Sequence, residues 1–200
     1  NNNTIHNNNT IHNNNNKNII FSLATAFKCM NNNEFKEYVT QSTKNTNTLS
    51  KCLKNNKYVD IYSSNKNSNF INLKFNHFFF SIQAFYLFCQ RLNIMFDIIY
   101  PFCFDKQTSF NIGSNYLTTL GLIESDIEVV AEFINHSILL YFQVIQRIKN
   151  EKRGLENEPP HKLMDNLEHY LENSSISTEI ISLSNDITSF ISSFPSPYIF

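Results

Sequence analysis

Cysteine and histidine are the side chains of this chain best suited to hold a metal or to act as nucleophiles, and their spacing fits neither role. The four cysteines are widely separated: Cys29, Cys52, Cys89 and Cys103. Because no C-x-x-C pair occurs, neither a zinc ribbon nor a redox motif is predicted, and free thiols in a reducing compartment are the preferred interpretation. Four histidines also lack ligand spacing and are interpreted as surface or hydrogen-bonded helix residues: His77, His136, His161 and His169. We therefore expect no metal-ligating and no catalytic residue.

The N-terminal segment 1–18 is an asparagine-rich low-complexity tract. It contains the unit N-N-N-T-I-H twice, ending at His6 and His12. The tract has no apolar face to bury, so we predict that it is disordered. The two histidines could contact a metal, but a disordered tract would not fix their geometry.

Composition indicates a domain with a hydrophobic core and argues against a binding partner that is recognised by charge. The chain has 200 residues, of which 42% are hydrophobic, and its formal net charge is −1. This balance argues against nucleic-acid or membrane-surface binding. The apolar run from Phe78 to Cys89 is shorter than the ~20 residues of a membrane span, so it is predicted to be a buried helix. The basic run from Lys149 to Arg153 is interpreted as a solvated helix end.

Periodicity and end signals predict helices packed on a short sheet. The clearest helix runs from Ser125 to about Lys152, with a capping box of Ser125 and Glu128 and an apolar stripe at spacings of three and four. Other predicted helices are 19–30, 34–53 with Asn33 as its cap, 78–91, 163–171 and 176–194. Predicted strands are 58–62, 70–75, 93–99 and 109–113. The order of elements implies an α/β layer domain.

One segment after the third predicted strand has the form of a site motif. Residues 110–121 read F-N-I-G-S-N-Y-L-T-T-L-G. The frame of Ile112-Gly113, Leu117-Thr118-Thr119 and Gly121 resembles L-R-I-G-T-P-A-L-T-T-R-G. That motif belongs to serine hydroxymethyltransferases, enzymes of the fold type I pyridoxal-phosphate (PLP) superfamily.

Further stretches are similar to the same family and occur in the same order. Residues 16–30 resemble H-N-H-T-I-A-A-L-A-V-A-L-K-Q-A. The next stretch resembles P-E-F-K-x-Y-x-x-Q-V-V-x-N-A-x-x-L-A-x-x-L, and its matching residues include Glu34-Phe35-Lys36, Tyr38, Gln41, Asn45, Leu49 and Leu53. Asp126, Val130-Ala131 and Phe133-Ile134 resemble D-F-x-x-V-A-x-F-I, and 194–197 resemble the terminal F-P-x-P. Only the middle, from about Asn55 to Thr108, is poorly matched.

The resemblance implies a fold, a division of the chain and a function. It implies the C-terminal small α/β domain over 56–200, preceded by helices of the end of the large PLP domain over 19–55. The family interconverts serine and glycine with PLP and tetrahydrofolate in one-carbon metabolism. It also implies an intracellular protein of the mitochondrion or cytoplasm, and a homo-oligomer or a pairing with a homologous subunit.

The family's site residues are largely replaced in this chain. The arginine that binds the substrate carboxylate falls at Asn111, which offers a neutral amide in place of a charged planar fork. The PLP-lysine motif has no match, so no cofactor-binding residue is assigned. The N-K-N-T loop near the pterin falls at 97–101, where Ile98 or Ile99 takes the place of its second asparagine.

Three interpretations remain open at this point. The first is a serine hydroxymethyltransferase homologue. The second is a catalytically inactive paralogue that keeps the fold and acts as a structural or regulatory subunit. The third is the product of a decayed gene that has no stable fold.

Overall fold

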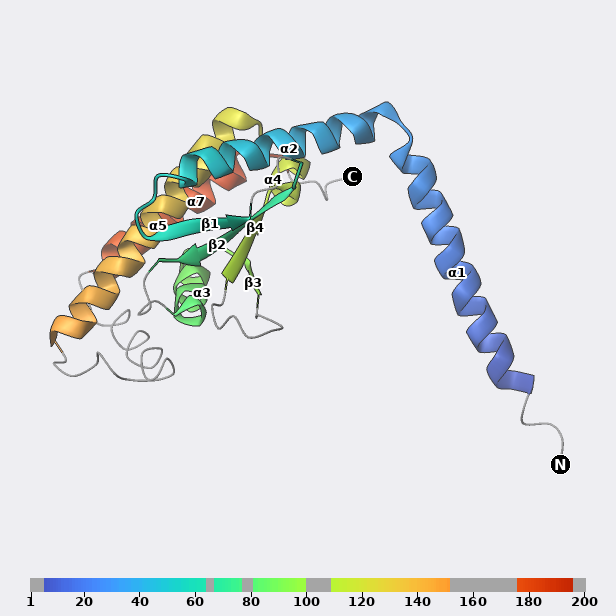
Figure 1. The fold of residues 1–200 in the computed structure, drawn as a ribbon, viewed down its shortest axis with the longest axis horizontal. Helices are drawn as coiled ribbons and strands as arrows, with labels where there is room; N and C mark the ends of the chain where they lie inside the picture. The colour runs from blue at the N-terminus through green and yellow to red at the C-terminus, as the bar shows by residue number, and fades with distance from the viewer. Residues whose placement is uncertain (1–5, 64–66, 77–80, 100–108, 152–175, 196–200) are drawn as a thin grey trace. The chain divides into compact units, whose positions relative to one another are not determined.

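The computed structural model describes residues 6–63, 67–76, 81–99, 109–151 and 176–195. Within these ranges it contains six helices and one four-stranded antiparallel sheet, which confirms a mixed α/β fold (Figure 1). The chain divides into two units, Asn1–Thr40 and Gln41–Phe200. The predicted helix at 163–171 lies outside the described residues.

The first unit is helical. It contains α1 (His6–Met30) and the beginning of α2 (Asn33–Leu53). The prediction that the asparagine tract is disordered is wrong from His6 onward, because α1 begins there. Once a helix has formed over the apolar part of α1, each added residue costs little and gains one backbone hydrogen bond.

The cap of α2 lies one residue earlier than predicted. The backbone N–H of Phe35 donates to Oδ1 of Asn32 at 2.8 Å. Asn33 is already the first helical residue, so Asn32 takes the N-cap position and satisfies the N–H of the third residue of the helix.

The second unit contains the sheet, with strand order β1-β2-β4-β3. Its strands are β1 (Val59–Ser63), β2 (Phe70–Phe75), β3 (Asp97–Ile99) and β4 (Ser109–Gly113). All neighbouring strands are antiparallel. Ile71, Leu73 and Phe110 are fully buried and face the core. Side chains alternate along a strand, so the residues between them face the opposite side of the sheet.

The third strand is shorter than predicted because its expected first residues close a helix. Helix α3 (Ile82–Arg91) ends in a hydrogen-bond pattern in which Ile94 N–H donates to the Cys89 carbonyl at 2.9 Å and Asn93 N–H donates to the Gln90 carbonyl at 3.2 Å. Asn93 has a φ of 58°. This is a Schellman motif with asparagine in the left-handed position.

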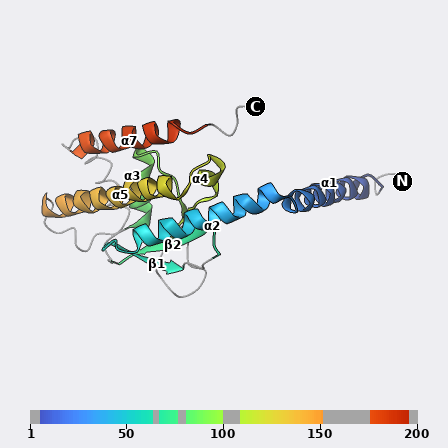
Figure 2. The ribbon, with the colours of Figure 1, turned by 90° about the horizontal axis from the view of Figure 1, so that it is seen from above.

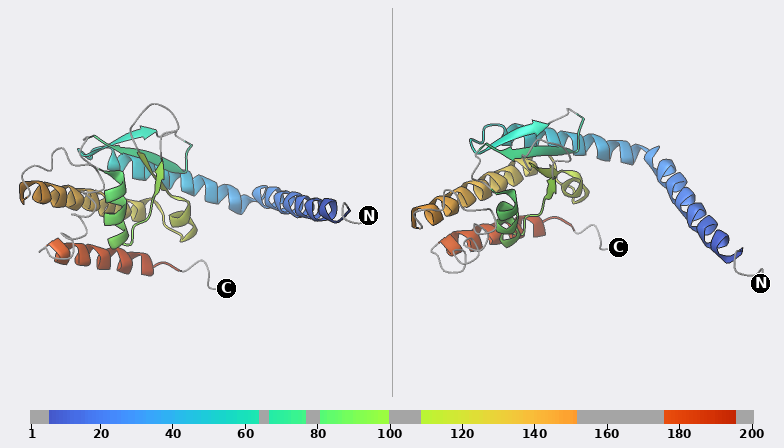
Figure 3. Two further views of the ribbon diagram at one scale, coloured as in Figure 1. Left: turned by 90° about the horizontal axis from the view of Figure 1, so that it is seen from below. Right: turned by 60° about the horizontal axis from the view of Figure 1, so that its bottom comes forward.

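Helices cover one face of the sheet. α3 and α5 (Glu124–Glu151) pack together against it, and α7 (Ile176–Ser192) packs on α5 beyond them (Figures 2 and 3). The short helix α4 (Asn115–Thr119), which the sequence did not predict, follows β4 directly. No described helix of this unit covers the other face of the sheet.

The predicted capping box of α5 is wrong. The helix begins at Glu124, and the backbone N–H of Ile123 donates to Oδ2 of Asp126 at 2.9 Å. The carboxylate three residues into the helix therefore binds back to the N-cap N–H. Ser125, the predicted cap, lies inside the first turn.

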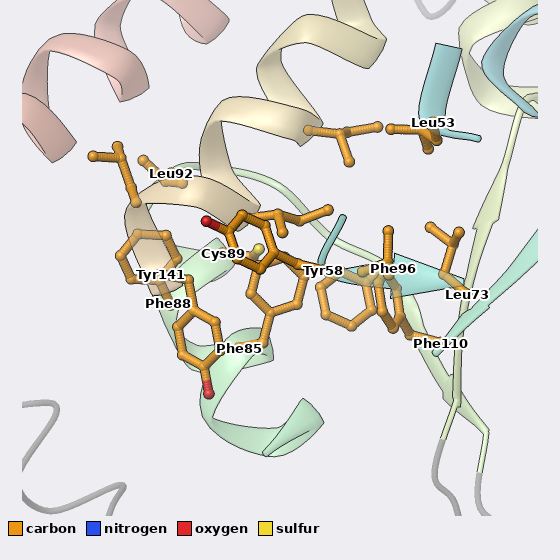
Figure 4. Packing of buried hydrophobic residues seen from close by; sticks show 14 of the residues in the cluster. Leu53, Tyr58, Leu73, Phe85, Phe88, Cys89, Leu92, Phe96, Phe110 and Tyr141 are labelled. Atoms are coloured by element: carbon orange, nitrogen blue, oxygen red, sulfur yellow. The ribbon is translucent and has the colours of Figure 1, made fainter. Parts of the chain in front are cut away.

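Aromatic rings fill the space between the sheet and the helices (Figure 4). The Phe85 ring of α3 lies 5.5 Å from the Phe110 ring of β4 and 5.2 Å from the Tyr141 ring of α5, measured between centroids. Tyr141 is fully buried, and its hydroxyl donates to the Ser81 carbonyl at 2.9 Å. Burial raises the pKa of Tyr141 far above its ordinary value, so this hydroxyl stays a hydrogen-bond donor.

Candidate functional site

Asn111, the predicted site residue, lies in the middle of β4. Its Cα partners are Asn72 on β2 and Asp97 on β3. Phe110 beside it is fully buried in the core, so Asn111 faces the opposite, helix-free side of the sheet. Cross-strand partners share a face, and the structure therefore brings Asn72, Asn111 and Asp97 together in one row.

Two amide oxygens in this row have no hydrogen-bond partner among the residues that the structure describes. Oδ1 of Asn72 and Oδ1 of Asn111 are both buried and unpaired, although each residue as a whole is only half-buried. A buried acceptor without a partner costs roughly 1–3 kcal/mol. The row thus holds buried acceptors at the place where the resembled family has a charged donor.

The charges on this face do not favour an anion. Asp97 is exposed beside Asn111, and Asp60 on β1 is exposed beside Lys74, which is half-buried. A substrate carboxylate at Asn111 would lie beside the exposed Asp97 carboxylate, and like charges in proximity repel. Asn111 in this setting therefore supplies no substitute for the arginine.

The rest of the motif is held by a buried hydrogen-bond network that reaches α2. Ser114 Oγ donates to the Ser42 carbonyl at 2.8 Å and lies 2.7 Å from Thr46 Oγ1. Ser42 Oγ in turn donates to Oδ1 of Asn115 at 2.8 Å. Ser42, Thr46 and Ser114 are almost fully buried, so each of these hydroxyls depends on nearby protein groups for a hydrogen-bond partner.

Asn45 is the centre of the second half of this network. Its Nδ2 donates to Oγ1 of Thr118 at 3.0 Å and to the carbonyl of Leu122 at 2.8 Å. Its own Oδ1 accepts from Nε2 of Gln41 at 3.0 Å. Asn45 is completely buried. Its Nδ2 is satisfied by groups more than seventy residues away, and its Oδ1 by Gln41 one turn earlier on the same helix.

The network ends at the first residue of α5. Nε2 of Gln41 also donates to Oε2 of Glu124 at 2.8 Å. The hydrogen bond from Gln41 lowers the pKa of the Glu124 carboxyl, because it favours the ionised form. One side chain of α2 therefore contacts both Asn45 and the N-terminus of the long helix.

Gly121 closes the motif for a conformational reason. Its φ is 89°, and a Cβ built on it would meet nothing within 4 Å. The constraint is therefore the left-handed backbone, which glycine adopts without steric cost, and not a lack of space. The turn lets the Leu122 carbonyl reach Asn45.

The described residues do not fit either cofactor of the resembled family. Ile98 and Ile99, at the pterin position, are half-buried hydrocarbons on β3 and offer no hydrogen bond. Every lysine whose side chain is described is exposed or, in the case of Lys74, half-buried. None of these described lysines lies in an enclosed site of the kind that holds a cofactor.

The cysteine and histidine predictions are tested only in part. Cys29 is exposed, and Cys52 and Cys89 are also free thiols; burial raises the pKa of Cys89 well above its ordinary value. His136 is exposed. Among the residues described, no group of three or more metal-ligating side chains gathers at one point.

One described helix, α5, is long and apolar enough by length and composition to cross a membrane. The segment concerned is Glu124–Ile148, but half of it is buried inside the protein. Ile127, Ile134 and Ile138 of this segment belong to the hydrophobic core. A core helix meets the same criteria of length and composition, and the packing of α5 is that of a core helix.

The comparisons with known proteins do not identify this chain. No model of a protein family matches it, and a search of curated proteins finds no match.

Sequence reasoning missed Asn72 and the buried hydroxyls of Ser42 and Thr46. A signal for Asn72 was present in the sequence. It is the polar residue between the apolar Ile71 and Leu73, and this alternation places its side chain on the face opposite the core. The pairing of Asn72 with Asn111 could not be predicted from the sequence, because it depends on which strands are neighbours in the sheet. Ser42 and Thr46 looked like weak helix formers, and only their contacts show why they are buried.

We expect Asn45→Leu to lower the free energy of unfolding by about 2–4 kcal/mol. The change leaves Thr118 Oγ1 and the Leu122 carbonyl without the donor that now satisfies them. Urea unfolding followed by circular dichroism measures the effect. Asn185→Leu, which replaces an exposed asparagine of α7, is the control and should change stability by less than about 0.5 kcal/mol. Equal effects of the two substitutions would show that the network does not stabilise the fold.

Proposed function

We propose that this chain is the C-terminal small-domain portion of a serine hydroxymethyltransferase-type protein whose substrate-carboxylate position is impaired. The family function is serine and glycine interconversion with PLP and tetrahydrofolate. On this proposal the protein acts inside the cell, in the mitochondrion or cytoplasm.

The main support for the proposal is a contact between two stretches that each resemble the family and lie far apart in the sequence. Gln41 and Asn45 match the stretch of the second helix, whereas Thr118 matches the site motif some seventy residues later. Asn45 nevertheless donates to Thr118. Residues that match a family motif by chance have no reason to meet, so their hydrogen bond supports a shared architecture.

The sheet face supports the second half of the proposal. In the family motif an arginine stands where this chain has Asn111. Here the side-chain oxygen of Asn111 is unpaired and Asp97 lies beside it. Loss of one partner of a desolvated charge pair costs about 2–5 kcal/mol, which corresponds to roughly thirty- to several-thousand-fold weaker binding. We therefore infer that serine and glycine are bound poorly.

Asn111→Arg tests the assignment of this position. The variant should bind glycine roughly thirtyfold or more tightly than the wild type, measured by isothermal titration calorimetry with methylamine as the ligand that lacks a carboxylate. Ser109→Arg is the matched control, because Ser109 lies two residues away on the same strand and face. If both variants bind glycine equally, the position of Asn111 is not a carboxylate site.

A second candidate function is that of an inactive subunit that pairs with an active homologue. α1 favours it, because several large apolar side chains are exposed there: Ile19, Ile20, Phe21, Leu23, Phe27 and Met30. Ile20, Leu23, Phe27 and Met30 are spaced by three and four residues and so form one stripe along the helix. Exposed apolar patches of this kind are typical of interaction sites.

Co-expression of the tagged chain with an active serine hydroxymethyltransferase tests this candidate. We expect the active enzyme to co-purify and to bring visible PLP absorbance that the tagged chain alone lacks. The variant Leu23→Glu/Phe27→Glu should abolish co-purification, whereas Thr25→Glu, on the same helix, should not. Co-purification that survives the double substitution would rule out the α1 stripe as the contact.

A further inference from the structure

One side of α1 carries a stripe of large apolar side chains that the described residues leave uncovered. The stripe consists of Ile20, Leu23, Phe27 and Met30, which are spaced by three, four and three residues. Between 46% and 67% of each of these side chains is exposed. Burial of apolar surface is favourable, so the stripe gains free energy when a partner of matching shape covers it.

Polar residues limit the stripe at both ends. The same spacing continued toward the N-terminus reaches Asn16, and Met30 is followed by three asparagines at 31–33. The two lysines of α1, Lys17 and Lys28, fall outside the stripe, and α1 contains no acidic residue. Covering the stripe therefore buries no charge. A matching partner presents four apolar side chains over about 15 Å of helix.

A second copy of the stripe meets this requirement when it runs in the opposite direction. The spacing of three, four and three residues is the same when the helix is reversed. A two-fold axis beside Thr25 therefore places Ile20 opposite Met30 of the second copy, and Leu23 opposite its Phe27. Each phenylalanine ring then packs against a leucine, whereas a parallel pair would place two rings in one layer.

The residues beside the stripe also suit an antiparallel pair. Ala24 and Ala26 lie on the two sides of its centre, and small side chains at a contact let two helix backbones come close together. The chain that follows Met30 leaves an antiparallel pair at opposite ends, so the two copies of α2 do not meet. We propose that α1 is a dimerisation helix whose stripe packs antiparallel on the same stripe of a second copy of this chain.

The proposed interface is small. Four apolar side chains from each copy bury a total on the order of 1,000 Å², which is at the low end for specific protein interfaces. Interfaces of this size that lack charged contacts at their centre do not reach high affinity by area alone. We therefore expect a dimer with a Kd of roughly 1–100 µM.

This inference goes beyond the proposed function, because it uses only the spacing and the exposure of side chains on α1. Failure of Asn111→Arg to bind glycine would overturn the family assignment and leave the dimer untouched, whereas a monomeric chain would leave the family assignment untouched. It differs from the second candidate function in its partner, which is a copy of this chain and not an active homologue.

Sedimentation equilibrium of the full chain under reducing conditions tests the dimer. The molar mass should rise from that of one chain, 23.4 kDa, toward twice this value as the concentration passes the Kd. Leu23→Lys/Phe27→Lys should weaken association at least a hundredfold, because it places charges in the apolar contact. Ser22→Lys/Thr25→Lys, which adds the same charges on the opposite side of the helix, should leave it unchanged. Circular dichroism checks that both variants keep the helical signal.

Disulfide formation tests the orientation of the two helices. Two chains of different tag length carry Ile20→Cys and Met30→Cys, and both carry Cys29→Ser because the native thiol of Cys29 is exposed on the same helix. They are oxidised separately and as a mixture. We expect the mixture to give a cross-linked product that contains one chain of each kind, and each chain alone to give much less.

Three results would overturn the proposal. The first is a chain that stays monomeric up to about 500 µM, well above the expected Kd, including one that binds an active homologue instead. The second is a dimer that Leu23→Lys/Phe27→Lys weakens no more than Ser22→Lys/Thr25→Lys does. The third is cross-linking of each cysteine variant with itself as readily as in the mixture, which would show a parallel pair.

Discussion

The hydrogen-bond network between α2 and residues 114–122 is the constraint on which the described domain depends. Asn45 donates to Thr118 and to the Leu122 carbonyl. Ser114 Oγ donates to the Ser42 carbonyl and lies within hydrogen-bond distance of the Ser42 and Thr46 hydroxyls. Buried polar groups tolerate few arrangements, because every member needs its partner. The network therefore fixes where β4 ends and where α5 begins.

The position of the open sheet face follows from that constraint. Ser114 directly follows β4, and its backbone N–H donates to the Asn69 carbonyl at 2.9 Å, next to the start of β2. This contact sets the register that opposes Asn72 and Asn111. Phe110 is then buried in the aromatic core, so Asn111 must face away from it. A buried polar network on one side thus determines which acceptors appear on the other.

Much of the fold was predictable because it follows from local patterns. Strands β2 and β4 and the long apolar stripe of α5 were predicted with their bounds correct to within one or two residues. The helix ends were less predictable. The structure uses Asn32 and Asp126 as capping side chains, whereas the sequence predicted Asn33 and Glu128, and these candidates differ only in which backbone N–H they reach. The pairing of Asn72 with Asn111 needs the strand order, which no local pattern contains.

A double-mutant cycle between Asn45 and Thr118 tests the central claim most directly. The claim is that two stretches distant in the sequence are joined by this hydrogen bond, and that they fold as one unit. Asn45→Leu, Thr118→Val and the double variant are compared by urea unfolding. We expect a coupling free energy of about 1 kcal/mol or more, as for residues in one network. Effects that add to within about 0.3 kcal/mol would contradict it.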